Sequence, residues 1–161
     1  MGDTNQPRAC STCPAICGSV VDRGEPFGPL CDHCWADVQA LEDHRQALTE
    51  GADAPAPPAP PLCRDCGTEQ DRFETGYGHW VLLEPRTPLP AHIVPDGQRW
   101  AIGSDGCAVN WGDGFPSDHN CRIRHELVCP VRQRPDTLPP VFGIIWDENR
   151  RQCETSMSDT G

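Results

Sequence analysis

Two cysteine pairs near the start of the sequence have the residue types and the spacing of a metal site. Cys10 and Cys13 lie in CSTC, and Cys31 and Cys34 lie in CDHC, which together give C-x2-C-x17-C-x2-C. This spacing is typical of a four-cysteine zinc site. Two CxxC turns can place four thiolates at about 2.3 Å from one tetrahedral ion. The pattern therefore predicts a structural zinc ion bound by these four cysteines.

Cys17 offers an alternative within this first group. The segment CPAICG would allow Cys13 and Cys17 to bind the ion and leave Cys10 unused. We favour Cys10 and Cys13, which give the spacing above. We expect His33, inside CDHC, and His44, on the segment that follows, to be surface residues.

A third pair, Cys63 and Cys66 in CRDCG, has the form of a zinc knuckle and needs two more ligands. The candidates are Cys107, Cys121, His125 and Cys129. We expect Cys107 to be a buried thiol, because it lies in a predicted strand.

The segment CRIRHELVCP contains three of these candidates at a spacing of four residues. Neighbours at this spacing lie about 13 Å apart in a strand, and the two ends lie about 12 Å apart in a helix. A regular element can therefore supply at most two ligands to one ion. We prefer Cys129 as one ligand, because Pro130 ends the segment rigidly. Cys121 or His125 would be the other, and we lean towards Cys121, which requires a turn between residues 122 and 128.

The elements that would position these ligands are short. GSVVDRGEPFGPL, residues 18–30, predicts a hairpin that turns at Gly24 and Gly28, and Trp35, Val38, Leu41 and Leu48 then follow a helical period. Later segments predict short strands at residues 79–85, 91–94, 98–103 and 107–112. We expect three tryptophans to fill the core of this sheet: Trp80, Trp100 and Trp111. Residues 136–151 predict a helix with an apolar stripe.

These elements predict a small, metal-stabilised α+β fold with two modules. The first is a treble-clef or zinc-ribbon-like finger at residues 8–49, and the second is a small antiparallel β domain with a zinc clip and a C-terminal helix at residues 63–153. Between them, residues 50–62 are rich in Pro and Ala and predict a semi-rigid extended linker. We expect residues 154–161 to form a disordered tail.

Several stretches together resemble the signature of an actinobacterial, zinc-ribbon-like family of unknown function. They are WVLLEP, the VP…RW segment, DG.AVN and CRI.H.LVCP, and the resemblance covers about residues 63–150. The resemblance implies that five candidates belong to one recurring signature: Cys63, Cys66, Cys121, His125 and Cys129. It implies no activity, and the N-terminal finger looks like a separate attachment.

Composition limits where such a protein would work. The 161 residues include 11 Cys but are only 37% hydrophobic, so we expect metal ions to stabilise a thin core. The polar opening, MGDTNQPRACSTCP, predicts no secretory signal, and no apolar run approaches the roughly 20 residues of a membrane span. We therefore expect a cytoplasmic protein with reduced cysteines and about two structural zinc ions.

Charge and motifs favour one class of function over two others. The net charge of −11 disfavours nucleic acid as a partner, so we expect an adaptor or regulator that binds other proteins. A nucleic-acid-binding regulator is the alternative and would need six arginines on one face: Arg64, Arg72, Arg86, Arg99, Arg122 and Arg124. A metalloenzyme of unrecognised type is the second alternative, although no HExxH, GxSxG or Walker motif occurs. No small-molecule substrate is indicated, and no catalytic residue is assigned.

Overall fold

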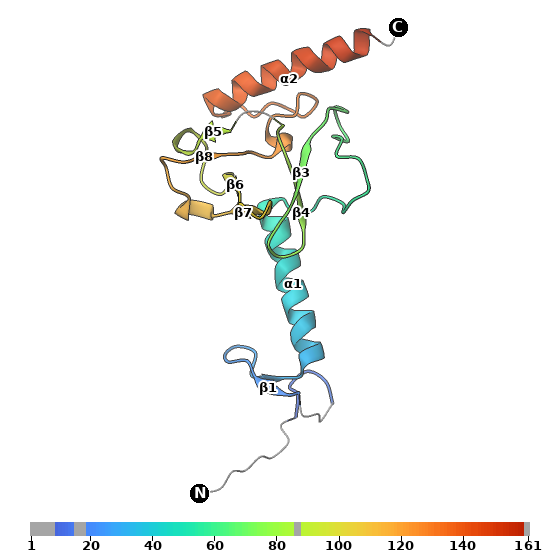
Figure 1. Cartoon of the computed structure of the whole chain (residues 1–161), viewed down its shortest axis with the longest axis vertical. Helices are drawn as coiled ribbons and strands as arrows, with labels where there is room; N and C mark the ends of the chain where they lie inside the picture. Colours follow the sequence, from blue (N-terminus) through green and yellow to red (C-terminus); the bar gives the residue numbers. More distant parts are fainter. Residues whose placement is uncertain (1–8, 15–18, 86–87, 160–161) are drawn as a thin grey trace, which may run out of the picture. The chain divides into compact units, whose positions relative to one another are not determined.

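The computed structural model describes residues 9–14, 19–85 and 88–159. It divides into two compact units, Met1–Arg45 and Gln46–Gly161. Over the described residues it holds two α-helices and four two-stranded antiparallel sheets (Figure 1). The predicted small α+β class is confirmed. Neither helix is both long enough and apolar enough to cross a membrane.

The first unit is built on a hairpin and the start of a helix. Strands β1 (Val21–Asp22) and β2 (Pro29–Leu30) pair antiparallel, with Val21 opposite Leu30. The loop between them turns at Gly24, whose φ of 79° is open to glycine at little cost. The carboxylate of Asp22 accepts the Gly24 N–H at 3.0 Å and fixes this turn.

Helix α1 (Asp32–Glu50) begins directly after Cys31, as the sequence predicts. Trp35 and Val38 pack against the buried Leu30 and the cysteines. Leu41 and Leu48, predicted to continue this apolar stripe, are instead 66% and 57% exposed. The hairpin and its cysteines are small, so in the first unit they cover only the first two turns of the helix.

The described part of the second unit contains six short strands in three antiparallel pairs. The pairs are β3 (Asp71–Glu74) with β4 (Trp80–Leu83), β5 (Leu89–Pro90) with β8 (Asn120–Cys121), and β6 (Trp100–Ile102) with β7 (Ala108–Asn110). Three 3-10 helices complete it: η1 (Ala91–Ile93), η2 (Gly112–Gly114) and η3 (His125–Leu127). The strand predicted at residues 91–94 is therefore wrong.

Isolated β-bridges join residues 122–124, which directly follow β8, to β4 and to β6. Leu83 pairs with Arg124, and Trp100 pairs with Arg122. Residues 122–124 therefore lie between β4 and β6, and Arg124 lies opposite Leu83 at the end of β4. Sequence-distant residues meet here, which is where the second candidate site forms.

Two apolar clusters fill the second unit. One is built around Val81, Leu83 and Trp100, and the other around Ile123, Val128 and Phe142. Of the three tryptophans predicted to form the core, only Trp100 is fully buried. Trp80 is half-buried, and Trp111 is 53% exposed. The alternation of β4 explains Trp80, because Val81 and Leu83 take the buried face.

The Pro- and Ala-rich stretch at residues 50–62 lies against the second unit. Ala52 is fully buried, and the Ala54 N–H donates to the Trp80 carbonyl at 3.0 Å. Farther on, the Gln70 N–H donates to the Pro61 carbonyl at 2.7 Å. The stretch thus packs on the second unit, whereas its composition predicts a semi-rigid extended linker between modules. Proline keeps its carbonyl as an acceptor, so it can take part in this packing. The units divide between Arg45 and Gln46, inside α1.

Helix α2 (Pro140–Ser158) buries Phe142, Ile145 and Asn149. It starts later and ends later than the predicted helix at 136–151, so residues 154–158 of the predicted disordered tail are helical. Ion pairing of Arg150 with Glu154 at 3.0 Å supports this last part of the helix. The final two residues of that predicted tail, 160–161, lie outside the described residues.

Candidate metal centres

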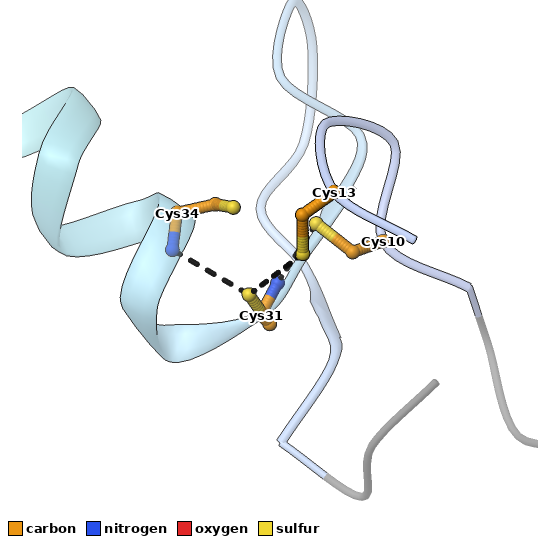
Figure 2. A group of neighbouring side chains, drawn as sticks. All are labelled: Cys10, Cys13, Cys31 and Cys34. Carbon is orange, nitrogen blue, oxygen red and sulfur yellow. Dashed lines mark hydrogen bonds between the residues drawn. The ribbon is translucent and has the colours of Figure 1, made fainter. Parts of the chain in front are cut away.

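The first candidate centre consists of Cys10, Cys13, Cys31 and Cys34 (Figure 2). Their four sulfur atoms all lie within 4.8 Å of one another. The Sγ atoms of Cys13 and Cys31 are 3.7 Å apart, far beyond the roughly 2.05 Å of a disulfide bond. The structure therefore brings together the four cysteines that the sequence predicts, as free thiols that can hold a metal ion.

Local backbone geometry places these sulfurs. The Ser11 N–H donates to the Pro29 carbonyl at 2.9 Å, which holds the first CxxC turn against β2. Cys31 caps α1: its Sγ accepts the Cys34 N–H at 3.5 Å, and its carbonyl accepts the Trp35 N–H. Both later cysteines thus lie at the N-terminus of a helix, where the helix dipole stabilises thiolates.

The thiols of this cluster differ in acidity. Backbone N–H groups, chiefly that of Cys13, lower the pKa of Cys10 to about 6. A side-chain hydrogen bond with Cys31 raises the pKa of Cys34 well above its ordinary value. Cys10 can thus hold a negative charge readily, whereas the thiol of Cys34 would lose its proton to a bound cation.

The two histidines of the first unit do not join this cluster. Cys17 lies outside the described residues. The side chain of His33 is 85% exposed and lies 3.6 Å from Asp37, and His44 is exposed. Both histidines are therefore on the surface, as predicted.

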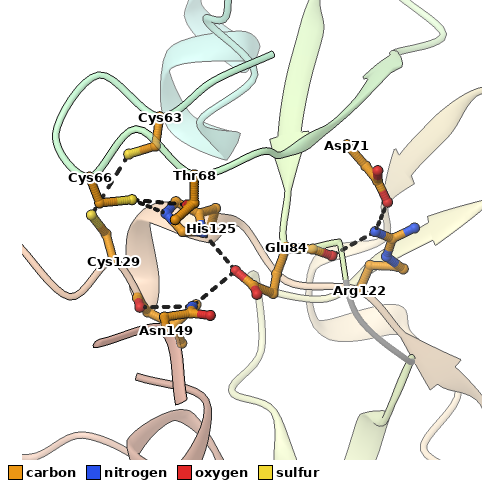
Figure 3. Close-up of polar contacts among 10 residues, drawn as sticks. Cys63, Cys66, Thr68, Asp71, Glu84, Arg122, His125, Cys129 and Asn149 are labelled. Carbon is orange, nitrogen blue, oxygen red and sulfur yellow. Dashed lines mark hydrogen bonds and ion pairs between the residues drawn. The ribbon is translucent and has the colours of Figure 1, made fainter. Parts of the chain in front are cut away.

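The second candidate centre consists of Cys63, Cys66, His125 and Cys129 (Figure 3). Their ligand atoms also lie within 4.8 Å of one another. Cys63 Sγ lies 3.7 Å from Cys129 Sγ, and Cys66 Sγ lies 3.2 Å from His125 Nε2. Three sulfurs and one imidazole nitrogen therefore converge from two segments that are more than 50 residues apart in the sequence.

The loop of Cys63 and Cys66 has the form of a knuckle. The Cys63 N–H donates to the Thr68 carbonyl at 2.9 Å, and the Gly67 N–H donates to the Cys63 carbonyl at 2.9 Å. Gly67 has a φ of 73°, which glycine adopts readily. The hydroxyl of Thr68 lies 3.0 Å from Cys66 Sγ. This loop therefore fixes both sulfurs through its own backbone.

The 3-10 helix η3 shows how His125 and Cys129 reach one point. After it, the Val128 N–H donates to the His125 carbonyl at 2.9 Å, so the chain turns back within four residues. Of the three candidates in this segment, only His125 and Cys129 come together. This agrees with the expectation that the segment supplies at most two ligands to one ion.

Our preference for Cys121 over His125 is corrected. Cys121 is 1% exposed and packs in the apolar cluster with Ile123 and Val128. Cys121 pairs with Leu89 in the β5–β8 sheet, and this pairing keeps it apart from the turn that brings His125 and Cys129 together. Burial raises the pKa of its thiol to about 11, as suits an apolar core position.

Glu84, which sequence reasoning missed, orients the histidine. Its carboxylate oxygen Oε2 lies 2.6 Å from His125 Nδ1, and the two side chains are 4% and 2% exposed. An ionised carboxylate only accepts, so Nδ1 carries the proton and the lone pair of Nε2 faces the sulfurs. Histidines that bind metal ions are commonly held in this way. The available signal was a single acid that ends an apolar strand, in WVLLEP.

Asn149 of α2 completes this arrangement. Its Nδ2 donates to Glu84 Oε2 at 3.3 Å and to the Val128 carbonyl at 3.2 Å (Figure 3). The C-terminal helix therefore anchors the carboxylate that holds His125. Cys153 of the same helix places its Sγ 3.8 Å from the Cys66 carbonyl.

Electrostatics in the second centre follow from burial and charge. Burial raises the pKa of Cys129 to about 12 and also raises that of Cys66. Burial acts on Cys63 in the same direction, but backbone N–H groups outweigh it and lower the pKa of that thiol. Burial alone would lower the pKa of His125, yet the hydrogen bond and charge of Glu84 raise it overall. As in the first cluster, a bound cation would displace protons.

Cys107, like Cys121 and Cys153, lies outside both clusters. Cys107 is half-buried just before β7, so the predicted buried thiol is only partly covered. Its backbone N–H donates to the Asp105 carboxylate at 3.0 Å, in the turn between β6 and β7. Within the described ranges, the two four-residue clusters are the groups of Cys, His, Asp and Glu that can hold a metal ion.

Comparisons with known proteins agree with the resemblance noted in the sequence. A family model described as a family of unknown function (DUF6083) matches residues 44–158. The match extends the expected range of 63–150 in both directions, so it includes the proline-rich stretch and all of α2. No curated protein and no solved structure matches the chain.

Proposed function

The chain belongs to the family of unknown function DUF6083, and on this premise we propose that it is a zinc-stabilised adaptor or regulator that acts by binding other proteins. One observation carries the proposal: each unit contains a complete set of four protein donors. Structural zinc sites are closed in this way, whereas a catalytic site keeps one position for water or substrate.

The chemistry and spacing of the donors support zinc. Thiolate and imidazole are the ligands that zinc prefers in structural sites. Two sulfurs at about 2.3 Å from one tetrahedral ion would lie about 3.8 Å apart. One sulfur pair in each cluster is 3.7 Å apart: Cys13 with Cys31, and Cys63 with Cys129.

The order of elements in the first unit supports a treble-clef type of finger. A CxxC turn precedes a hairpin, and the second pair, Cys31 and Cys34, opens a helix. Such a unit presents a long exposed helix, and α1 carries the exposed Leu41. An exposed apolar side chain of this kind suits a protein partner.

The arginines support a protein partner over nucleic acid. Of the six that a nucleic-acid face would need, three form ion pairs: Arg99 with Asp96, Arg122 with Asp71, and Arg124 with Glu126. Arg86 lies outside the described residues. Paired guanidinium groups release fewer counterions from a phosphate backbone.

Zinc stoichiometry tests the structural part of the proposal. Protein purified with zinc under reducing conditions should contain about two ions per chain, and Cys34→Ser and Cys129→Ser should each lower this to about one. Cys121→Ser is the matched control, because Cys121 is as buried as Cys129 but lies outside the cluster. A content of two ions in Cys129→Ser, or of one in Cys121→Ser, would contradict the assignment.

A binding comparison tests the adaptor role. The zinc-loaded chain should capture defined protein partners from its native host, and chelation should release them. The same preparation should bind DNA and RNA only weakly at about 0.15 M salt, with a shallow salt dependence. Tight nucleic-acid binding without a protein partner would overturn the role.

A further inference from the structure

A cavity of about 530 Å³ lies in the second unit, where the Pro- and Ala-rich stretch borders the β3–β4 sheet. Part of its wall is apolar and comes from that stretch: Ala54, Pro55, Ala59, Pro60 and Leu62. Another part carries four arginines: Arg64, Arg72, Arg124 and Arg132. Pockets of this volume, which combine apolar walls with a few polar groups, are typical ligand sites.

The register of the β3–β4 sheet places Arg72 on the face that borders this cavity. Arg72 pairs with Leu82, and both residues line the cavity. Directly opposed residues share one face of a sheet. Val81 and Leu83, which flank Leu82, are fully buried on the other face, in the apolar core. Gln70 also lines the cavity, and it lies two residues before Arg72 and therefore on the same face.

Two of the four arginines are neutralised by acids of the same wall. Arg124 forms an ion pair with Glu126, and Arg132 forms one with Asp65 at 2.8 Å. The other two arginines form no ion pair with any residue that the structure describes. The wall therefore offers two positive charges that are not already paired.

The polar groups of Arg72 and Gln70 are accessible to a ligand. Of the three guanidinium nitrogens of Arg72, only Nε is both enclosed and without a partner. The two terminal nitrogens have no hydrogen-bond partner in the described chain either, so they keep accessible surface. The same holds for the side-chain amide of Gln70, although this residue is only 7% exposed. Polar groups held in this way gain by meeting an acceptor.

The charges of the wall favour a carboxylate as that acceptor. A guanidinium binds a carboxylate or a phosphate through two parallel hydrogen bonds. The wall also contains the exposed Asp53 and the metal donor Cys63. Their negative charges would oppose a phosphate dianion more than a singly charged carboxylate.

We infer that this cavity binds the carboxylate of an acidic side chain in a segment of a protein partner. The unpaired guanidinium groups of Arg72 and Arg64 neutralise the carboxylate, and the amide of Gln70 donates a further hydrogen bond. The apolar part of the wall packs against the methylene groups that carry the carboxylate. The inference rests on the proposed adaptor function and names the chemistry of its partner.

Titration of the ¹⁵N-labelled, zinc-loaded full chain with the peptide Ala-Ala-Glu-Ala-Ala, blocked at both ends, tests this. The Nε–H signal of Arg72 and the side-chain amide signals of Gln70 should shift saturably. The same peptide with Gln in place of Glu has the same shape without the charge. It should bind about 10-fold or more weakly, as loss of a hydrogen bond between charged groups does.

Arg72→Met removes the guanidinium and keeps an apolar side chain on the same face of β3. It should weaken binding of the Glu peptide about 10-fold or more. Arg151→Met is the matched control and should bind normally, because it removes the same charge from an exposed arginine of α2 outside the cavity. If Arg72→Met unfolds the unit, the comparison of the Glu and Gln peptides on the unchanged chain still decides the question.

Three results would overturn the inference: equal affinity for the two peptides, no saturable shift of either signal, or an equal loss of affinity in the two variants. Tighter binding of inorganic phosphate than of the Glu peptide would overturn it as well, and would indicate a phosphate site instead. Because zinc content and partner capture are measured separately, such a failure leaves the adaptor function standing.

Discussion

The two candidate metal centres differ in how their donors are drawn from the sequence. All four sulfurs of the first come from residues 10–34, that is, from a CxxC turn before the hairpin and from the start of the helix after it. The second joins a knuckle at Cys63 and Cys66 to a turn at His125 and Cys129. The first is thus a local motif, and the second is a product of the fold.

The two units also differ in how much apolar core they have besides the metal donors. In the first unit, three of the four buried residues of the core are the cysteines themselves. The second unit has two apolar clusters besides its cysteines and histidine, including the fully buried Trp100 and Leu83. A metal ion would therefore act as the core of the first unit and as a clip on an existing core in the second.

Removal of the metal should produce the largest difference between the units. A strong chelator with a reductant should unfold the first unit, because a structural zinc contributes about 10–16 kcal/mol of apparent binding free energy in small fingers. The second unit should lose its knuckle but keep its apolar core. In ¹H–¹⁵N spectra, the amide signals of Leu30 and Trp35 should lose dispersion, while those of Val81 and Trp100 keep it.

Re-addition of zinc is the control and should restore the signals of the first unit. Loss of dispersion by both units in one step would show that the metal is as central to the second unit as to the first. Persistence of the Leu30 signal without metal would show that the hairpin folds by itself, and the contrast between the units would then be wrong.

The donors of the first centre could be predicted from the sequence, and those of the second only in part. The spacing from Cys10 to Cys34 fixes a finger with few alternatives. Between Cys66 and His125, by contrast, the chain passes through six strands, and no spacing rule reports where it returns. The sequence therefore narrowed the fourth donor to Cys121 or His125, and the pairing of β8 with β5 decided between them.

The core was harder to predict than the donors for a similar reason. Trp80, Trp100 and Trp111 are chemically alike, and only the register of the strands buries Trp100. Glu84 escaped notice because its role depends on His125, 41 residues away, and on Asn149 in α2. Long-range pairing, rather than composition, sets both outcomes.

Glu84→Gln should sharpen the contrast with an effect of intermediate size. The amide keeps the shape but loses the charge that holds the Nδ1 proton of His125, so zinc affinity at the second centre should fall about 10–100-fold. The described donors of the first centre are four cysteines without a histidine, so this centre should be unaffected. Titration with a competing chelator, which resolves the two affinities, measures both.

Glu74→Gln is the matched control, because Glu74 is an exposed acid on β3 and lies outside both clusters. It removes the same charge without touching the histidine. An equal loss of affinity in the two variants would mean that net charge, rather than the orientation of His125, controls the second centre.

Hydrogen bonds to sulfur provide the finest distinction between the centres. In the first, backbone N–H groups of Cys31 and Cys34 donate to the sulfurs of Cys10 and Cys31, so no side-chain substitution removes them. In the second, Cys66 Sγ has a side-chain neighbour, the Thr68 hydroxyl at 3.0 Å.

Thr68→Val should therefore have a small effect that is confined to the second centre. The substitution keeps the shape of the side chain and removes one hydrogen bond to a thiolate, a net contribution of about 0.5–1.5 kcal/mol, so zinc affinity there should fall about 2- to 10-fold. Thr155→Val, on the exposed part of α2, is the control and should change neither affinity. If Thr68→Val lowered zinc affinity more than Glu84→Gln does, the knuckle loop would stabilise this centre more than the contacts of His125 do. The second centre would then resemble the first, since a local loop would determine both.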